Sequence, residues 1–285
     1  MNNLKDERKE FEALGMIYPS EKDVTVEPVT IAGIQNYWIT SPAIVSEVIV
    51  IYLHGGGFIY GSIHSHKAMT TYFAKSLGYR ILFVEYSLAP EKPFPAALDE
   101  TVKVISELSN SNPDFKFILM GDSCGGNLVM STALKFKSLA MSPALAQVVI
   151  SPWINLEPEY PSYDENEDSD PIITKEFVRY AASLFGAADK KSPFASPIYG
   201  DFTGLGPTLI LVGAKEILRD DSIFLHHALE KSGCHSELQL FENVTHVWTL
   251  TDIASADSRK ALSDINTFLR SVNSNEPNSL LLSKA

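Results

Sequence analysis

The sequence has few cysteines, few basic residues and no long apolar run. Its two cysteines, Cys124 and Cys234, lack the spacing of metal ligands, so we expect free thiols and a reducing compartment. The formal charge of −12 argues against nucleic acid and anionic membrane partners, because both reward clustered lysine and arginine. No stretch approaches the about 18 apolar residues of a membrane helix, and residues 1–12 are charged where a signal peptide is apolar. We therefore expect a soluble cytoplasmic protein without membrane insertion.

Apolar runs that alternate with helical patterns predict a mainly parallel sheet. The chain of 285 residues is long enough for one large α/β domain. The strand-like runs are residues 48–53, 80–84, 117–120, 147–151, 208–212 and 237–241. Helices between such strands act as right-handed crossovers, which make neighbouring strands parallel. Residues 24–40 instead alternate apolar and polar around Gly33, which predicts a hairpin at the sheet edge.

Two further segments have the spacing of helices that cover the sheet. Phe11 and Leu14 belong to an amphipathic pattern near the N-terminus, and Phe177 belongs to another over residues 174–185. The acidic stretch 157–170 predicts a solvated loop rather than a metal site, because it lacks the glycine and spacing of a calcium loop. We expect an N-terminal cap segment over residues 1–22, a main α/β domain over 23–272 with a cap insertion at about 157–192, and a polar tail over 273–285.

The stretch G-D-S-C-G at residues 121–125 fits G-x-S-x-G, the strand-to-helix turn that exposes a nucleophilic serine. A β-carbon at Gly121 or Gly125 would collide with neighbouring main chain, which explains the two glycines. The turn leaves Ser123 at the N-terminus of a helix, where unpaired N–H groups favour negative charge. The motif therefore predicts acyl transfer at Ser123, with an ordinary glycine-rich turn as the alternative.

Three successive glycines follow the first central strand, in the sequence H-G-G-G-F at residues 54–58. Glycine repeated in this way is costly in entropy, so the loop needs a close backbone approach that side chains would block. An oxyanion hole has that requirement, because its N–H groups must point at the developing charge. A flexible loop or a phosphate cradle is the alternative, although a P-loop is excluded because no G-K-[ST] follows. We expect His54 to brace this loop.

A nucleophilic serine needs a base and an acid that orients the base. Of the seven histidines, His246 alone follows the carboxyl end of the last strand, on the edge where open α/β sheets carry their sites. Glu216, Asp220 and Asp221 follow the preceding strand. We favour Glu216 as the acid because it is nearest the strand end, and the aspartates are alternatively helix N-terminal charges.

Taken together, these motifs resemble those of the hormone-sensitive lipase-like family of α/β-hydrolases, in particular its microbial carboxylesterases. The match includes H-G-G-G-F at residues 54–58, Y-S-L-A-P-E at 86–91, F-P-A-A at 94–97 and G-D-S-C-G-G at 121–126. The resemblance implies an α/β-hydrolase fold with a small helical cap. It also implies that the N–H groups of Gly56, Gly57 and Cys124 form the oxyanion hole.

Several positions depart from the family pattern. Cys124 replaces the usual alanine and puts a thiol beside the nucleophile, while Glu216 replaces aspartate, so its longer side chain must fold back or His246 must shift. Val247 and Trp248 replace Gly-Phe, which restricts the backbone after the base and places an indole near the pocket. The glutamate is the departure that bears most directly on catalysis.

We predict a serine carboxylesterase that hydrolyses short-chain acyl esters through an acyl-enzyme, with a small-molecule ester as its partner and with no metal or cofactor. Ser123 attacks, His246 relays the proton and Glu216 orients His246. The predicted pocket walls, for which ordinary core positions are the alternative, are Phe58, Trp153 and Trp248. Lactone, amide or formamide hydrolysis and a catalytically silent small-ligand receptor are the rival functions. The sequence leaves the oligomeric state open, with a homodimer as one option.

Overall fold

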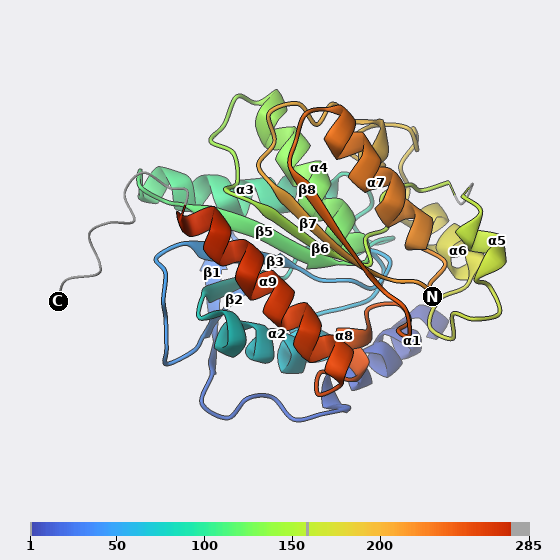
Figure 1. Cartoon of the computed structure of the whole chain (residues 1–285), viewed down its shortest axis with the longest axis horizontal. Helices are drawn as coiled ribbons and strands as arrows, with labels where there is room; N and C mark the ends of the chain where they lie inside the picture. The colour runs from blue at the N-terminus through green and yellow to red at the C-terminus, as the bar shows by residue number, and fades with distance from the viewer. Residues whose placement is uncertain (1, 158–159, 275–285) are drawn as a thin grey trace.

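An eight-stranded sheet runs through the computed structural model, which describes residues 2–157 and 160–274 (Figure 1). The strand order is β1-β2-β4-β3-β5-β6-β7-β8. The strand bounds are β1 Thr25–Ile31, β2 Ile34–Thr40, β3 Ile49–Leu53, β4 Arg80–Val84, β5 Phe117–Asp122, β6 Gln147–Ile150, β7 Thr208–Gly213 and β8 Ser236–Phe241. β2 pairs antiparallel with β1 and β4, and the pairs from β4 to β8 are parallel. The predicted fold class and edge hairpin are confirmed.

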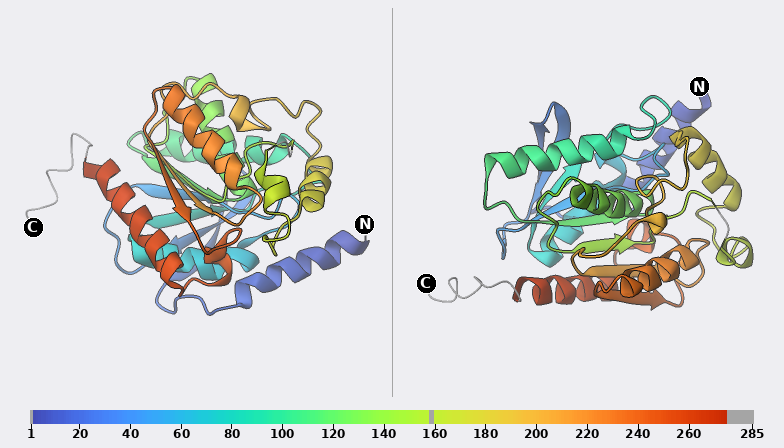
Figure 2. Two further views of the ribbon diagram at one scale, coloured as in Figure 1. Left: turned by 45° about the vertical axis from the view of Figure 1, so that its right-hand side comes forward. Right: turned by 90° about the horizontal axis from the view of Figure 1, so that it is seen from above.

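Helices cover both faces of this sheet (Figures 1 and 2). Their bounds, with the short 3-10 turns η1 and η2, are α1 Asn2–Glu12, η1 Ala13–Met16, α2 Ile63–Leu77, α3 Ala96–Ser111, α4 Cys124–Ser138, α5 Ser162–Glu165, α6 Lys175–Phe185, η2 Pro197–Tyr199, α7 Arg219–Lys231, α8 Trp248–Thr251 and α9 Ala256–Ser274. α2, α8 and α9 pack on one face, and α3, α4 and α7 pack on the other. α1 and α6 lie at the same end of the sheet (Figure 2).

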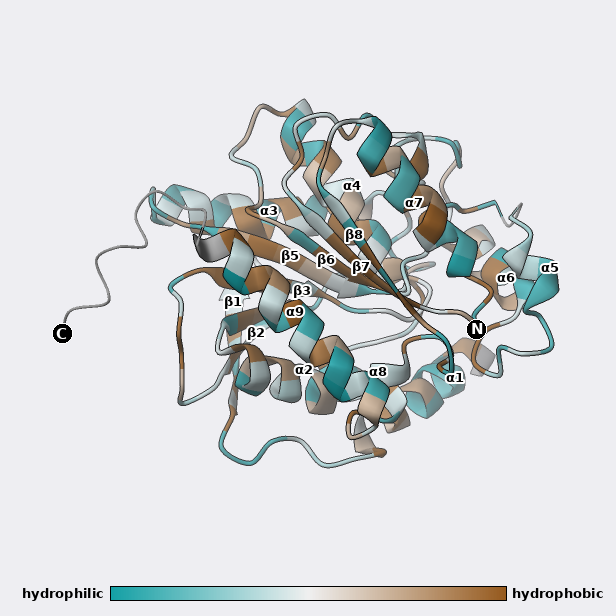
Figure 3. Ribbon diagram, viewed as in Figure 1, coloured by the Kyte–Doolittle hydropathy of each residue, from teal (hydrophilic) through white to brown (hydrophobic). Residues whose placement is uncertain are grey.

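The central strand β3 shows why two apolar cores form. Successive side chains of a strand point to opposite faces. Ile51 and Leu53 therefore join the core beneath α3 and α4, whereas Val50 and Tyr52 join the core beneath α2 and α9. Hydrophobic residues are concentrated on these strands and on the inner helix faces (Figure 3). With both faces covered, the carboxyl ends of the parallel strands are left to carry the site.

One predicted helix boundary is wrong. The apolar pattern predicts a helix that starts near Lys67, but α2 begins at Ile63 because the side chains of Ser62 and Ser65 form a reciprocal capping box. His64 and His66, which the sequence places before the helix, therefore lie in its first turn. His66 is fully buried there.

The acidic stretch 157–170 is not simply a solvated loop. α5 occupies part of it, and Asp170 is buried, with its carboxylate accepting the N–H groups of Ile172 and Ile217. This carboxylate therefore ties the segment that follows β6 to the residue after Glu216. Of the predicted polar tail, residues 273 and 274 continue α9 and the others lie outside the described residues.

Candidate active site

Ser123 lies in a strained turn between β5 and α4. Its φ of 53° and ψ of −122° fall in a region that residues with a β-carbon rarely adopt. The turn is held by glycines: a β-carbon on Gly121 would lie 2.6 Å from the carbonyl oxygen of Leu53, and one on Gly125 would overlap the same oxygen. The Ser123 N–H donates to the Ile150 carbonyl at 2.9 Å, which fixes the turn against β6.

Hydrogen bonds join Ser123, His246 and Glu216 in one chain. His246 Nε2 is 2.9 Å from Ser123 Oγ, and its Nδ1 is 2.9 Å from Glu216 Oε2. Glu216 Oε1 also accepts the N–H of Gly213, three residues earlier. The longer glutamate side chain therefore folds back on its own strand end, and the imidazole keeps its place between hydroxyl and carboxylate.

The surroundings of His246 in this hydrogen-bonded series favour the charged imidazolium. Burial by itself lowers the pKa of His246, but the hydrogen bond and negative charge of Glu216 outweigh it. The pKa of His246 consequently lies above the ordinary value of 6.5. An imidazole of this kind can receive the proton of a serine hydroxyl and hold it.

The two alternative acids face other partners. Asp220 accepts the N–H of Ser162, and Asp221 accepts the N–H groups of Ile154 and Asn155. Burial raises the pKa of the Asp221 carboxyl to about 8. The side chains of both aspartates therefore connect α7 to the segment after β6, and Glu216 is the carboxylate that contacts His246.

The glycine loop lies beside the hydrogen-bonded side chains of Ser123, His246 and Glu216. Gly56 and Gly57 have φ values of 115° and 62°, and a β-carbon on Gly56 would overlap the Tyr60 carbonyl oxygen. His54 Nδ1 donates to the Gly55 carbonyl at 2.7 Å, while the Tyr86 hydroxyl donates to the His54 carbonyl at 2.6 Å. Burial lowers the pKa of His54 to about 3, so its ring braces the loop in the neutral form.

A cavity of about 180 Å³ opens on Ser123 and His246. Its walls come from the N-terminal segment, the glycine loop, the turn around Ser123 (the elbow), α6 with the stretch leading into it, and the segment from His246 to the end of α8. The lining residues are Phe11, Leu14, Gly56, Gly57, Tyr60, Asp122, Ser123, Ile172, Ile173, Phe177, His246, Val247, Leu250 and Thr251. Apart from Asp122, Ser123 and His246, these residues offer apolar or uncharged walls. The cavity therefore suits an uncharged, mainly apolar ligand.

Comparison with known proteins agrees with this fold. The family model described as the alpha/beta hydrolase fold matches residues 50–250. The chain belongs to this family. An esterase of the bacterial hormone-sensitive lipase family superposes on the hydrolase with a TM-score of 0.91 and 33% identity, covering 94% of this chain and 91% of that chain. The hydrolase is therefore a member of the hormone-sensitive lipase group.

Curated relatives of the hydrolase carry related names. An esterase of Acinetobacter venetianus is 29% identical over 93% of this chain and 88% of its own length. An acetyl-hydrolase of Streptomyces hygroscopicus is 31% identical over 85% of this chain and 81% of its own. Within the part of the hydrolase that the structure describes, no helix has the length and apolar character needed to cross a membrane.

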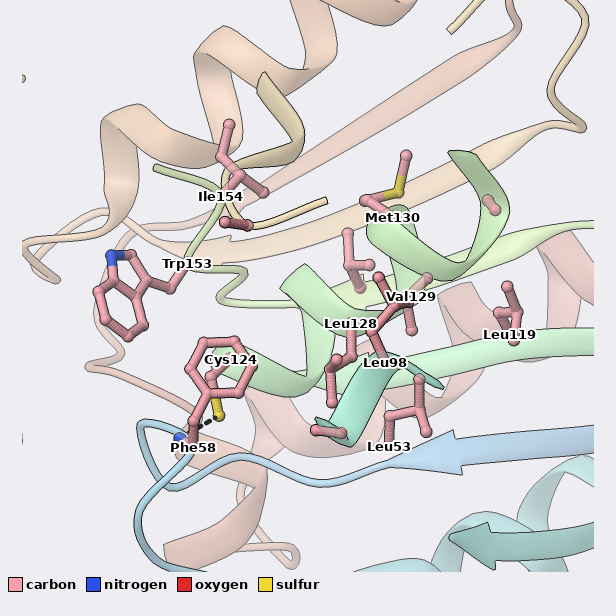
Figure 4. Close-up of a cluster of buried hydrophobic side chains, with 14 of the residues drawn as sticks. Leu53, Phe58, Leu98, Leu119, Cys124, Leu128, Val129, Met130, Trp153 and Ile154 are labelled. Carbon is pink, nitrogen blue, oxygen red and sulfur yellow. Dashed lines mark hydrogen bonds between the residues drawn. The ribbon is translucent and has the colours of Figure 1, made fainter. Parts of the chain in front are cut away.

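The Cys124 thiol of the hydrolase points to the glycine loop rather than into the cavity. Cys124 Sγ accepts the N–H of Phe58 at 3.1 Å (Figure 4). Phe58 has a φ of 64°, so this bond holds a strained residue at the end of the loop. Burial raises the pKa of the thiol to about 12. The cysteine that replaces alanine thus adds a contact between elbow and loop.

Asp122 is a site residue that the sequence reasoning missed. It accepts the Tyr52 hydroxyl at 2.6 Å and the Gly55 N–H at 3.1 Å, and His66 Nε2 lies 3.4 Å away. Burial raises the pKa of Asp122, but the charge and hydrogen bond of His66 outweigh it, so the pKa lies below its ordinary value. The side chain ties the elbow to the glycine loop. The sequence signal that could have identified Asp122 is its position between Gly121 and Ser123 in the G-x-S-x-G motif.

The predicted pocket walls Phe58, Trp153 and Trp248 do not line this cavity, which corrects the prediction. The ring centroid of Phe58 lies 3.9 Å from that of Phe185 in α6, on which it stacks, and 5.8 Å from that of Trp153. Figure 4 shows Phe58 and Trp153 in this cluster. Trp248 packs on Phe241 at 4.7 Å in the opposite core. The three rings are instead packed in the two apolar cores, and the aromatic side chains of the cavity wall are those of Phe11, Tyr60 and Phe177.

Among the described residues, a group of three potential metal ligands lies outside this cavity. His226, His227 and Glu230 gather on α7, where the last two side chains are exposed. None of them lines the cavity or contacts the Ser123 chain.

Proposed function

We propose that the hydrolase is a serine carboxylesterase that cleaves short-chain acyl esters through an acyl-enzyme. The observation that carries the proposal is the hydrogen-bonded chain from Ser123 through His246 to Glu216, which opens on an apolar cavity. The names of the relatives, among them an esterase, an acetyl-hydrolase and a carboxylesterase of Mycobacterium tuberculosis, support the same reaction.

In the first half-reaction Ser123 Oγ attacks the ester carbonyl carbon while its proton passes to His246 Nε2. The carbonyl oxygen becomes an oxyanion, for which the N–H groups of Gly56, Gly57 and Cys124 are the proposed donors. Collapse of the tetrahedral intermediate breaks the bond to the alcohol oxygen, which takes the proton from His246. The acyl group is then bound to Ser123, and the alcohol leaves.

In the second half-reaction a water molecule attacks the acyl carbon and gives its proton to His246 Nε2. The carboxylic acid is released when Ser123 Oγ recovers that proton. Glu216 accepts from His246 Nδ1 throughout, so it keeps the tautomer with Nε2 free and stabilises the imidazolium that forms in each half.

The size of the cavity supports short acyl chains. A volume of about 180 Å³ holds a small apolar group, and Phe11 and Phe177 narrow it from the two segments that we propose as a cap. The absence of a lysine or arginine among the described lining residues favours uncharged esters over anionic ones.

The test is a series of p-nitrophenyl esters from acetate to long acyl chains, with Ser123→Ala as the control. We expect the highest kcat/KM on the shortest chains and loss of turnover in Ser123→Ala. Aryl formamides and lactones assayed beside the esters would reveal the rival hydrolase if they were turned over faster. Failure of a fluorophosphonate to label Ser123 in folded protein would favour the silent receptor. The homodimer and the cytoplasmic location stay predictions, and sedimentation velocity measures the first.

A further inference from the structure

Ser151 occupies the junction between the strands that carry the nucleophile and the acid. It follows β6, which lies between β5 and β7 in the sheet. Its N–H donates to the Leu211 carbonyl of β7 at 2.7 Å, while the preceding Ile150 carbonyl accepts from Ser123. Ser151 is fully buried, and its side chain is not part of the Ser123–His246–Glu216 chain.

The direction of the Ser151 hydroxyl is fixed by its two partners. Its oxygen lies 3.1 Å from the N–H of Val247 and 2.8 Å from Glu216 Oε1. A backbone N–H can only donate, so the Ser151 oxygen accepts from Val247. The single hydroxyl proton is then free to bind the carboxylate. One side chain therefore joins the acid to the residue that follows the base.

Both oxygens of the Glu216 carboxylate are held as a result. Oε1 accepts from Ser151 and from the Gly213 N–H, and Oε2 accepts from His246. A glutamate has one more side-chain torsion than an aspartate, and its terminal torsion is broad. Donors on Oε1 restrict that torsion, so Oε2 stays directed at the imidazole.

The backbone is strained where this contact is made. Ser151 has a φ of 49°, and the branched Val247 has a φ of 45° and a ψ of 50°. Left-handed conformations are unfavourable for residues with a β-carbon, most of all for branched ones, and persist where surrounding contacts enforce them. The hydroxyl is one such contact, because it binds the Val247 N–H directly.

We propose that Ser151 is a positioning residue, whose hydroxyl holds the Glu216 carboxylate in the orientation that binds His246. This inference rests on the proposed esterase function. Ser151 acts through Glu216 and does not line the cavity. Loss of its hydroxyl lowers the fraction of enzyme in which acid and base are aligned, and so lowers kcat rather than weakening substrate binding.

The experiment compares Ser151→Ala and Ser151→Gly with Ser258→Ala. Glycine suits the left-handed backbone at position 151, so it removes the hydroxyl while relieving strain. Ser258 is a matched control, because it is also fully buried and its hydroxyl donates to the Asp252 carbonyl, away from the site. We expect kcat to fall about 10- to 100-fold in both Ser151 variants, by analogy with the loss seen when a residue that orients a metal ligand is replaced, with KM changed less than about threefold. Ser258→Ala should keep the parental kcat.

A double-mutant cycle with Glu216→Gln separates positioning from a general effect on folding. If Ser151 acts through the acid, Ser151→Ala costs much less in the Glu216→Gln background than in the parent. An equal loss in both backgrounds would overturn the proposal. So would a Ser151→Gly enzyme with parental kcat, because the backbone rather than the hydroxyl would then be what matters.

A spectroscopic measurement tests the same contact without turnover. The proton on His246 Nδ1, held by Glu216, should give a low-field proton resonance that shifts or broadens in both Ser151 variants and stays unchanged in Ser258→Ala. An unchanged resonance in the Ser151 variants contradicts the proposal. A parent protein that cleaves no ester and is not labelled by fluorophosphonate refutes the proposed function instead, and the resonance still decides the role of Ser151.

Discussion

The two sides of the active site are held by different forces. On the sheet edge, buried polar groups fix each other: Glu216 has donors on both carboxylate oxygens, and Asp122 ties the elbow to the glycine loop. On the opposite side, apolar contacts dominate. Phe11 stacks on Tyr60 with 5.6 Å between the ring centroids, and Tyr60 stacks on Phe177 with 5.9 Å between them. The sheet edge is fixed mainly by hydrogen bonds, whereas the opposite side is held mainly by packed rings, to which Arg8 and the Tyr60–Glu7 pair add hydrogen bonds.

The difference assigns separate tasks to the two sides. A buried hydrogen-bond network loses much of its value if one partner is removed, because the others are left unsatisfied. Aromatic contacts have no such requirement, and apolar substitutions that conserve volume usually cost little. Changes on the sheet edge should therefore alter kcat for every ester, whereas changes in the proposed cap should alter which ester is preferred.

Glu216→Gln should have the largest effect. The amide keeps the size of the side chain but removes the charge that orients and stabilises the imidazolium, so kcat should fall by roughly 10³- to 10⁴-fold on all chain lengths. Asp220→Asn is the control, since that carboxylate contacts Ser162 and Arg219 instead. Steady-state kinetics on p-nitrophenyl acetate and hexanoate measure both. A loss confined to one ester would break the proposed contrast.

The pH dependence should move with the same substitution. His246 must be neutral to accept the Ser123 proton, and its raised pKa puts the acid limb of kcat/KM above pH 6.5. Glu216→Gln removes the charge that raises this pKa and leaves the burial that lowers it, so the residual activity should have its acid limb at lower pH. A pH profile from 5 to 9 measures the shift. A limb that stays in place would mean that Glu216 does not set the protonation of the base.

Phe177→Ala should change selectivity more than rate. The substitution enlarges the cavity where its ring now stands, so the ratio of kcat/KM on octanoate to that on acetate should rise by roughly tenfold. Tyr180→Ala is the matched control, because Tyr180 lies on the same helix with its side chain exposed. An equal fall on every chain length would place Phe177 with the sheet edge rather than with the cap.

Arg8→Ala should have the smallest effect. Arg8 attaches α1 to the body of the protein through the carbonyls of Ile59 and Ala89 and through Glu91, which is largely exposed. Partly exposed bonds of this kind contribute little, so kcat/KM on acetate should change by less than about threefold. Hydrogen exchange in α1 should nevertheless become faster, while Lys9→Ala leaves it unchanged. Unaltered exchange in Arg8→Ala would mean that apolar packing alone holds α1.

The fold and the reacting side chains could be predicted because their signals are local. Alternating apolar runs specify the sheet, and Ser123, Glu216 and His246 each follow a strand end, so parallel strands bring them to one edge. The structure brings the three into hydrogen-bond contact, and their roles in catalysis stay predictions.

The pocket walls could not be predicted in this way. The direction of the Phe58 ring depends on a φ of 64°. For a residue other than glycine, the sequence gives no signal of such a positive φ. Ser151 was likewise unremarkable in the sequence, because its importance comes from two partners 65 and 96 residues further along the chain. Burial and the choice of hydrogen-bond partner depend on the tertiary structure, so they cannot be predicted from the residues at the end of one strand.

The sulfhydryl of Cys124, next to the nucleophile, can serve as a chemical reporter of local unfolding. Thiolate is the form that reacts with alkylating agents, and at neutral pH the buried Cys124, with its pKa raised to about 12, is almost entirely protonated and out of reach. Cys234 is buried as well. Iodoacetamide should therefore leave the native protein unmodified, and the rate at which it labels position 124 would record how often the turn that carries Ser123 comes apart.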